Sequence, residues 1–368
     1  MPKVLGIVSF RVFPTHMGGQ KGVALFYRYL SQYLPVILAS SNDNRDSGKL
    51  QQESLLYPNR SIYRNIGKLS AMKQMIARHA VDVIIAEHSY AGWMAWWLYR
   101  RTGKPFIIHS HNIETSRFRQ MHKKWWPLYG WYEGWVHRRA QHNFFISHED
   151  REAAIALFHL DARRCSVITY GVERMPLAGD KKTLRNSLGL EADTTILLFN
   201  GTLDYSPNYD AVVLLANTIE PLLRKSMKNF RIIITGNRAP ASLISIIQSN
   251  PNLHYEGYVE HVHLYYQAAD LFLNPIANDT GVKTKLIEAV ANNCTAISTV
   301  AGASGIDRSV CGEKIITVAD KDWDNFAGQV LSHAGKATVD TPPEFYEAYA
   351  WDRITARAAE IIKELSNP

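Results

Sequence analysis

Residues 268–291 read A-A-D-L-F-L-N-P-I-A-N-D-T-G-V-K-T-K-L-I-E-A-V-A, and this stretch decides the fold prediction. Its apolar run Leu271–Leu273 predicts a buried strand, and Lys285–Asn292 has the spacing of an amphipathic helix. A polar loop with a single glycine joins the two. A short apolar strand that leads through such a loop into a helix is typical of an α/β protein with a parallel sheet, whose ligands sit beyond the carboxyl ends of the strands.

The loop and the first turn of this helix have the chemistry of an anion site. Backbone N–H groups at a helix start are free to bind an anion, and the helix dipole favours negative charge there. Gly281 permits a close approach, Lys283 and Lys285 add positive charge, and Glu288 offers two acceptors to the two hydroxyls of a ribose. The segment is therefore either a nucleotide diphosphate-sugar site or an ordinary helix cap with a solvated lysine pair.

The same alternation of short apolar runs and amphipathic stretches continues outward along the whole chain. In the first half, strands are predicted at Val4–Phe10, Val36–Ser40, Val81–Ala86, Phe106–His109 and Phe144–Ser147. In the second half, they are predicted at Thr195–Phe199, Arg231–Thr235, Leu271–Leu273, Ala296–Val300 and Lys314–Val318. The polar stretch Glu173–Lys182 reads as a linker. The sequence thus predicts two Rossmann-like, doubly wound parallel-sheet domains, residues 1–172 and 173–351, which face each other across a cleft.

Composition narrows the class of protein. A chain of 368 residues with 46% hydrophobic and 20% charged residues is globular and long enough for two domains. The three distant cysteines, Cys165, Cys294 and Cys311, match neither a disulfide framework nor a zinc site, which fits a reducing cytoplasm. No apolar run approaches a membrane span. The net charge of +7 favours anionic partners, but no nucleic-acid module is present, so nucleic acid is not expected.

The segment 117–139 has an unusual composition. It holds six Arg or Lys, one acid (Glu133) and seven aromatic residues: Phe118, Trp125, Trp126, Tyr129, Trp131, Tyr132 and Trp135. Tryptophans beside basic residues are typical of a patch that lies on an anionic membrane surface. Aromatic residues at helical spacing are also typical of a core. Both interpretations remain open at this point.

Further motifs occur in a characteristic order. The second half contains F-N-G-T-L-D-Y-S-P-N (Phe199–Asn208), I-I-I-T-G (Ile232–Gly236) and Y-E-G-Y-V (Tyr255–Val259), ahead of the stretch quoted first. The first half contains a Gly-Gly loop, H-N-I-E (His111–Glu114), I-S-H-E-D (Ile146–Asp150) and I-T-Y-G-V (Ile168–Val172). Ser147 in I-S-H-E-D is expected to cap a helix whose first turn is acidic, since no G-x-S-x-G elbow accompanies it. The ordered set resembles the GT-B glycosyltransferases, in particular the "glycosyl transferases group 1" family of retaining enzymes.

The resemblance implies roles at the matching positions. It implies that His111 is catalytic, close to the donor sugar. It implies a donor-binding set that consists of Gly18, Gly19, Gly201, Thr202, Gly257, Tyr258, Val259, Thr280, Gly281, Val282, Lys283, Thr284, Lys285 and Glu288. Two departures from the family pattern stand out: Thr280 replaces the first of two glutamates eight residues apart, and Thr202 and Lys283 replace the usual Arg and Gly. Lys283 or Lys285 is then expected to meet the diphosphate charge.

The activity implied by the resemblance is that of a retaining, hexosyltransferase-type glycosyltransferase. It would move a sugar from a nucleotide sugar to a glycan, polysaccharide or lipid-linked acceptor, without a cofactor or a catalytic metal. The protein would reside in the cytoplasm or peripherally on the inner membrane face. The C-terminal helix, residues 352–368, would complete the first domain. A nucleotide-sugar epimerase on the same fold and a non-catalytic sugar-nucleotide-binding protein remain alternatives.

Overall fold

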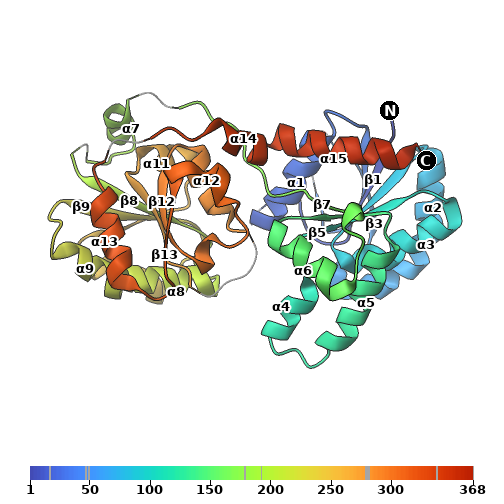
Figure 1. Cartoon of the computed structure of the whole chain (residues 1–368), viewed down its shortest axis with the longest axis horizontal. Helices are drawn as coiled ribbons and strands as arrows, with labels where there is room; N and C mark the ends of the chain where they lie inside the picture. The colour runs from blue at the N-terminus through green and yellow to red at the C-terminus, as the bar shows by residue number, and fades with distance from the viewer. Residues whose placement is uncertain are drawn as a thin grey trace. The chain divides into compact units, whose positions relative to one another are not determined.

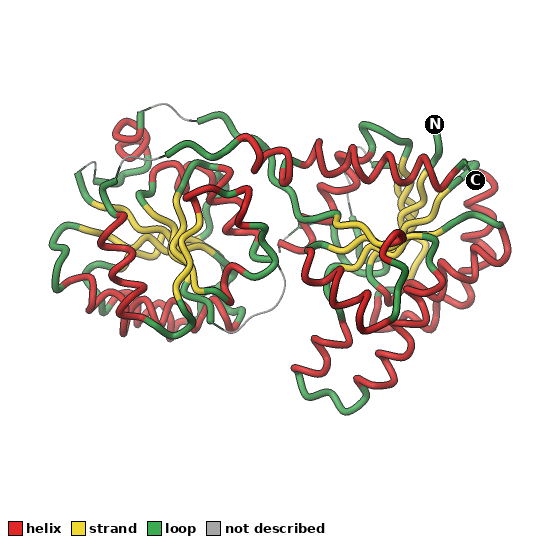
Figure 2. Tube along the Cα trace, viewed as in Figure 1, coloured by secondary structure: helices red, strands yellow, loops and turns green. Residues whose placement is uncertain are grey.

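The computed structural model describes residues 1–15, 18–45, 48, 50–177, 180–191, 193–277, 282–336 and 339–367, and of residues 59–63 it describes the backbone. The chain forms two compact units. Unit 1 comprises Met1–Gly171 with Trp351–Pro368, and unit 2 comprises Val172–Ala350. In each unit a sheet of parallel strands lies between layers of helices (Figures 1 and 2). Both units are therefore of the predicted α/β class.

Unit 1 is built on a seven-stranded sheet with the order β3-β2-β1-β4-β5-β6-β7. Its strands are β1 (Val4–Val8), β2 (Val36–Ser41), β3 (Gln51–Leu56), β4 (Val83–Glu87), β5 (Phe106–Ser110), β6 (His142–Phe145) and β7 (Cys165–Val167). Its helices are α1 (Gly18–Leu30), α2 (Leu69–Arg78), α3 (Gly92–Thr102), α4 (Glu114–Gln120), α5 (Trp126–Arg139), α6 (His148–Phe158) and α15 (Trp351–Ser366), with 3₁₀ segments at Asn59–Lys68, Ser89–Ala91 and Ala162–Arg164.

The central strands of unit 1 are buried along their whole length. Every residue of β1, β2, β4 and β5 is buried, which is why these strands read as continuous apolar runs in the sequence. Strand β3, with the sequence Q-Q-E-S-L-L, lies at the sheet edge, and of its residues only Leu56 is buried. The predicted set of strands lacks β3, since an edge strand of polar residues carries no apolar signal.

Helix α15 belongs to unit 1 and packs against α1. Its buried face carries Ile354, Ala358 and Ile362 at four-residue intervals. Trp351 begins the helix and is 2% exposed, and it stacks on Tyr29 of α1 with ring centroids 6.4 Å apart. The helix is thus attached by a conventional apolar stripe.

Helices α4 and α5 form a hairpin that projects from the body of unit 1 (Figure 1). Glycines let this hairpin pack closely at its base. A Cβ on Gly130 would lie 2.9 Å from the Thr115 side chain, and one on Gly134 would lie 2.8 Å from the ring of Phe158. Of the seven aromatic residues in segment 117–139, Trp125 and Trp131 are exposed and the other five are partly buried. The segment therefore contributes to the core and also presents an apolar surface.

Unit 2 is built on a six-stranded sheet with the order β10-β9-β8-β11-β12-β13. Its strands are β8 (Thr195–Asn200), β9 (Phe230–Thr235), β10 (Leu253–Gly257), β11 (Leu271–Asn274), β12 (Thr295–Thr299) and β13 (Ile315–Val318). Its α-helices are α7 (Lys181–Ser187), α8 (Ser206–Leu214), α9 (Glu220–Arg224), α10 (Ala241–Gln248), α11 (Val262–Ala268), α12 (Thr284–Ala291), α13 (Trp323–His333) and α14 (Pro343–Tyr349). A π-helical turn, Leu215–Ile219, joins α8 to α9, and 3₁₀ turns occur at Ala301–Ala303, Arg308–Val310 and Gly312–Lys314.

Two local predictions can be compared with the structure. The expected cap is confirmed: the Ser147 hydroxyl accepts a hydrogen bond from the Asp150 N–H at 3.0 Å, and Glu149 and Asp150 occupy the first turn of α6. The prediction that Gly18 and Gly19 lie in a loop is wrong, because both belong to the first turn of α1. The first residues of a helix have N–H groups without a hydrogen-bond partner inside the helix, so glycine is tolerated there.

In the described part of the chain, no helix has the length and apolar character of a bilayer span.

The close contact between α3 and α5 gives a stability test. A Cβ on Gly92, the first residue of α3, would overlap the side chain of Val136 in α5. We therefore expect Gly92→Ala to lower the free energy of unfolding by about 1–3 kcal/mol, the usual cost of overpacking a core. Urea denaturation followed by circular dichroism measures the change.

Two further variants make this test specific. Gly67→Ala is the control, because a Cβ there meets nothing within 4 Å. The double variant Gly92→Ala, Val136→Ala should be destabilised by less than the sum of the two single variants, since the smaller side chain makes room for the added methyl group. Additive losses would contradict the packing described here.

Candidate active site

The carboxyl ends of neighbouring strands in unit 2 carry the turns on which the sequence predicts a donor site. Strands β10, β9, β8 and β11 are adjacent in the sheet. Gly257 ends β10, Gly236 follows β9, and Gly201 follows β8. Because the carboxyl ends of parallel strands meet at one edge of a sheet, these three glycines lie along the same edge.

The glycines allow the backbones of these turns to touch. A Cβ on Gly236 would overlap the carbonyl oxygen of Gly201, and the Gly236 N–H donates to the carbonyl of Gly257 at 2.8 Å. Gly257 has a φ of +82°, in the left-handed region that favours glycine. This edge of the sheet is therefore lined by main chain, which a ligand can approach closely.

Lys285 is held against this edge. Its ammonium donates to Oδ1 of Asn208 at 2.6 Å and lies 4.6 Å from the centre of the Phe199 ring. The amide of Asn208 in turn donates to the carbonyl of Thr202 at 2.9 Å. The structure therefore brings together two residues of the predicted set, Thr202 and Lys285, and it adds Asn208, which the sequence analysis did not assign to the site.

Helix α12 presents the remaining described residues of the donor set. Lys283 immediately precedes the helix and is 6% exposed, while Val282, Thr284 and Lys285 are partly buried. Glu288 lies four residues after Thr284, one helical turn further on, and is also partly buried. At the end of β10, Tyr258 is largely exposed. The side chains around α12 are thus at the protein surface or just beneath it.

The rest of the predicted set consists of Thr280 and Gly281, Gly18 and Gly19, and Val259. Thr280 and Gly281 fall outside the described residues. Gly18 and Gly19 belong to unit 1, where they are exposed at the start of α1, and a Cβ on Gly19 would meet nothing within 4 Å. Val259 follows Tyr258 and is partly buried.

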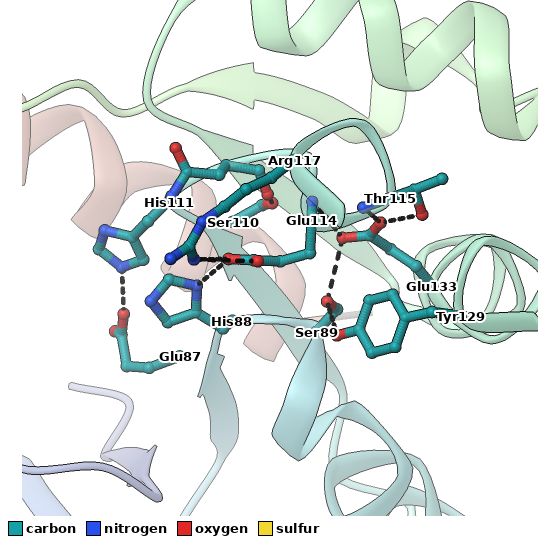
Figure 3. Close-up of polar contacts among 11 residues, drawn as sticks. Glu87, His88, Ser89, Ser110, His111, Glu114, Thr115, Arg117, Tyr129 and Glu133 are labelled. Atoms are coloured by element: carbon teal, nitrogen blue, oxygen red, sulfur yellow. Dashed lines mark hydrogen bonds and ion pairs between the residues drawn. The ribbon is translucent and has the colours of Figure 1, made fainter. Parts of the chain in front are cut away.

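A buried cluster of two histidines and a glutamate lies at the carboxyl edge of the sheet in unit 1. Glu87 is the last residue of β4 and is fully buried. Its Oε2 lies 2.6 Å from Nε2 of His111, and its Oε1 lies 3.2 Å from Nδ1 of His109 (Figure 3 shows the contact with His111). Strands β4 and β5 are adjacent, so residues at their ends lie side by side.

The protonation of this cluster follows from its burial. Burial alone would raise the pKa of Glu87, but the attraction of His109 and the hydrogen bonds from both rings outweigh it and hold that pKa well below its usual range. Burial, with His109 beside it, lowers the pKa of His111 from its ordinary value of 6.5. At neutral pH the cluster therefore holds an ionised carboxylate and a neutral His111.

His88 links this cluster to the loop that carries His111. It is partly buried and has a φ of +62° with a ψ of 158°, a conformation that is costly for any residue but glycine. Its Nδ1 lies 3.7 Å from Oε1 of Glu114, which is longer than a hydrogen bond, and Arg117 pairs with the same carboxylate at 3.2 Å (Figure 3). His88 lies between Glu87 and Ser89 in the chain, so its strained backbone sets the directions in which these two neighbouring side chains leave the strand end.

A second buried carboxylate fixes the loop from the other side. Glu133 of α5 is 0% exposed and accepts hydrogen bonds from the N–H groups of Glu114 and Thr115 at 3.1 and 2.8 Å. The hydroxyls of Thr115 and Ser89 donate to it at 2.5 and 3.1 Å (Figure 3). Glu133 thus satisfies the free N–H groups at the start of α4, which is the segment that directly follows His111.

Glu87, His109 and His111 are also the one group among the described residues that could hold a metal ion, with ligand atoms that all lie within 4.8 Å of one another. Their arrangement is complete without an ion, since each carboxylate oxygen has its own imidazole N–H partner. The sequence analysis named His111 but not Glu87. The signal was present: an acid at the end of an otherwise apolar buried strand, V-I-I-A-E, needs a partner.

Comparisons with known protein families give one match in each half of the chain. The model described as "Glycosyl transferases group 1" matches residues 194–334, and the model described as "Glycosyltransferase Family 4" matches residues 23–174. A curated relative from Klebsiella pneumoniae, an "Uncharacterized 44.6 kDa protein in cps region", is 27% identical over 145 residues. The matched stretch spans 38% of this chain and 37% of that relative.

Solved structures match over the whole chain. A glycosyltransferase from Rickettsia africae has a TM-score of 0.74 at 12% identity and covers 100% of this chain and 99% of its own. Alr3699/HepE from Anabaena, in complex with UDP and glucose, has a TM-score of 0.72 at 14% identity and covers 99% of this chain and 100% of its own. Both of these show the GT-B fold. The two family models together span most of the chain and identify it as a glycosyltransferase with a group 1 domain at residues 194–334 and a family 4 domain at residues 23–174.

Proposed function

We propose that this protein transfers a sugar from a nucleoside-diphosphate sugar to a hydroxyl of a glycan or lipid-linked acceptor, with retention of configuration and without a metal ion. The observation that carries the proposal is the edge of main chain in unit 2 at which Asn208 holds Lys285 beside Thr202. An ammonium next to packed glycine turns is suited to a diphosphate. Alr3699/HepE, which shares the fold, has been solved with UDP, with UDP-glucose, and with UDP and glucose.

The proposed roles follow from the chemistry of each group. Backbone N–H groups and Lys285 would stabilise the charge that develops on the departing diphosphate. Glu288 would accept hydrogen bonds from the ribose, and His111 would contact the reacting sugar. The acceptor oxygen would form its bond to the sugar carbon on the face that the phosphate leaves. The phosphate oxygen would take the proton of the acceptor hydroxyl, so no carboxylate nucleophile is required.

The related alternatives are separable by experiment. An epimerase would turn over its nucleotide sugar with no acceptor, and a non-catalytic binding protein would not turn it over at all. A thermal-shift screen of the purified protein against UDP-, GDP-, ADP- and TDP-sugars identifies the donor. Sugar release is then measured with and without glycan or lipid-linked acceptors. Product that forms only in the presence of an acceptor supports transfer over both alternatives.

The donor site gives the first test of this proposal. We expect Glu288→Ala to weaken binding of the nucleotide sugar by about 1.5–3 kcal/mol, the range for a lost charge-assisted hydrogen bond. Calorimetric titration measures the affinity. Glu313→Ala, at an exposed position of unit 2 outside the predicted donor set, is the matched control and should bind as the wild type does. Unchanged affinity in a folded Glu288→Ala protein would remove Glu288 from the site.

The metal-free mechanism gives the second test. We expect full activity in excess EDTA, because Lys285 and backbone N–H groups supply the positive charge that a divalent ion would otherwise provide. Activity is measured after EDTA treatment and again after addition of magnesium, manganese or zinc. Loss that only a metal restores would falsify the mechanism and would direct attention to Glu87, His109 and His111.

We further propose that the α4–α5 hairpin attaches the protein to an anionic membrane surface. Its exposed apolar side chains are Met121, Trp125, Leu128 and Trp131. Arg119, Lys123 and Lys124 are exposed on the same hairpin. The single acid between residues 115 and 139, Glu133, is fully buried, so this surface presents cations and no carboxylate. Exposed tryptophans beside lysines suit the interface of a bilayer with anionic headgroups.

Vesicle co-sedimentation tests the attachment. We expect binding to anionic vesicles at low salt, release at moderate salt, and weaker binding of Lys123→Glu with Lys124→Glu, because each basic residue near an anionic surface contributes about 1 kcal/mol. Lys225→Glu with Lys228→Glu is the matched control, since both lysines are exposed in unit 2. Equal binding to neutral and anionic vesicles, or equal loss in both double variants, would rule this surface out.

A further inference from the structure

Glu87 is a buried charge whose role the proposed reaction does not yet explain. Removing a carboxylate from water is costly unless hydrogen bonds compensate it. Glu87 is 0% exposed, and both of its oxygens face imidazole nitrogens rather than arginine or lysine. A chain that needed only a packed strand end here would be served by an apolar residue. The free-energy cost of burying this carboxylate therefore points to a role that involves the two imidazole rings it contacts.

The carboxylate determines which nitrogen of each ring carries the proton. An ionised carboxylate has no hydrogen to give and can only accept. At 2.6 Å from Oε2, Nε2 of His111 must therefore be the donor, and at 3.2 Å from Oε1, Nδ1 of His109 must be the donor. A neutral imidazole carries one proton, and in His111 that proton is on Nε2, which faces the carboxylate. Its other nitrogen, Nδ1, is then an unprotonated acceptor.

The remaining nitrogen of His111 is the one available to a substrate. Within the described residues, Nδ1 of His111 makes no hydrogen bond. His111 is also the most exposed member of the cluster, with 16% of its side chain exposed against 4% for His109 and 0% for Glu87. A lone pair on an imidazole accepts a hydrogen bond from a hydroxyl and repels an anionic phosphate oxygen. His111 is therefore prepared for the hydroxyl side of the substrate and not for the diphosphate.

We infer that Glu87 is a positioning residue that holds His111 in the Nε2–H tautomer, so that Nδ1 accepts a hydrogen bond from a substrate hydroxyl. The assignment rests on the proposed glycosyl transfer for the identity of that hydroxyl, which belongs to the sugar or to the acceptor. His109 has a supporting role, because its N–H satisfies the second oxygen of Glu87. The strained turn at His88 keeps the carboxylate at the strand end where it reaches both rings.

The tautomer can be measured directly on the full-length protein. Two-dimensional ¹H–¹⁵N spectra of the histidine side chains distinguish the two neutral tautomers, and the His111 signals are assigned by comparison with His111→Phe. We expect His111 to show the Nε2–H form at neutral pH. Observation of the Nδ1–H form overturns the inference. This measurement needs no substrate, so it remains decisive even if no donor or acceptor for the enzyme is found.

Kinetics then tests whether the tautomer matters to the reaction. Glutamine at position 87 has one acceptor and one donor group, so it cannot accept from both rings. We expect Glu87→Gln to lower kcat at least about tenfold and to leave the KM for the nucleotide sugar nearly unchanged, because loss of a tautomer-fixing carboxylate affects the reacting geometry and not the donor site. Glu220→Gln is the matched control, since Glu220 is a buried glutamate of unit 2 that binds Asn250 and Asn252.

A double variant shows whether Glu87 acts through His111. If it does, Glu87→Gln in the background of His111→Phe lowers kcat no further. A merely structural role would make the two losses multiply. Wild-type kcat in Glu87→Gln, or multiplied losses in the double variant, overturns the inference. Absence of transfer by the wild-type enzyme with every donor and acceptor would instead count against the proposed function, while the tautomer would still be decided by the spectra.

Discussion

The structure of unit 1 depends on one constraint: its central strands are buried on both faces. In β1, β4 and β5 no residue is exposed, so the sheet interior has no room for solvated polar groups. Polar side chains can then appear only where a strand ends. Glu87 ends β4, and His109 and His111 lie at the end of β5, so the burial that builds the core also gathers the chemistry at one edge.

Unit 2 also has a parallel sheet, but different residues stand at the ends of its strands. Glycines occupy the ends of β8, β9 and β10, so this edge is lined by main chain instead of titratable side chains. Its fixed charge is Lys285, held by Asn208. One sheet edge is thus suited to an anion, through N–H groups and an ammonium, and the other to a neutral hydroxyl, through an imidazole lone pair.

Much of this was accessible from the sequence, and the failures have physical reasons. Continuous apolar runs such as V-L-G-I-V identified the buried strands, and Lys285 and Thr202 were predicted before Asn208 connected them. Strand β3 was missed because an edge strand with polar residues has no apolar signal. Glu87 was missed because a sequence does not show which side chains from different strands meet. Distances of 2.6 and 3.2 Å to two rings, 24 and 22 positions further along the chain, are a property of the fold.

The buried Glu133 connects two features that the sequence presents separately. Segment 115–139 shows cations and tryptophans on its surface and holds its single carboxylate inside, where Glu133 accepts from the N–H groups of Glu114 and Thr115. The same carboxylate therefore keeps negative charge away from the exposed hairpin and anchors the loop that begins at His111. A buried carboxylate with several donors has little freedom to move without losing them. The hairpin and the His111 loop are thus held to each other by a common group, so the position of one constrains the position of the other.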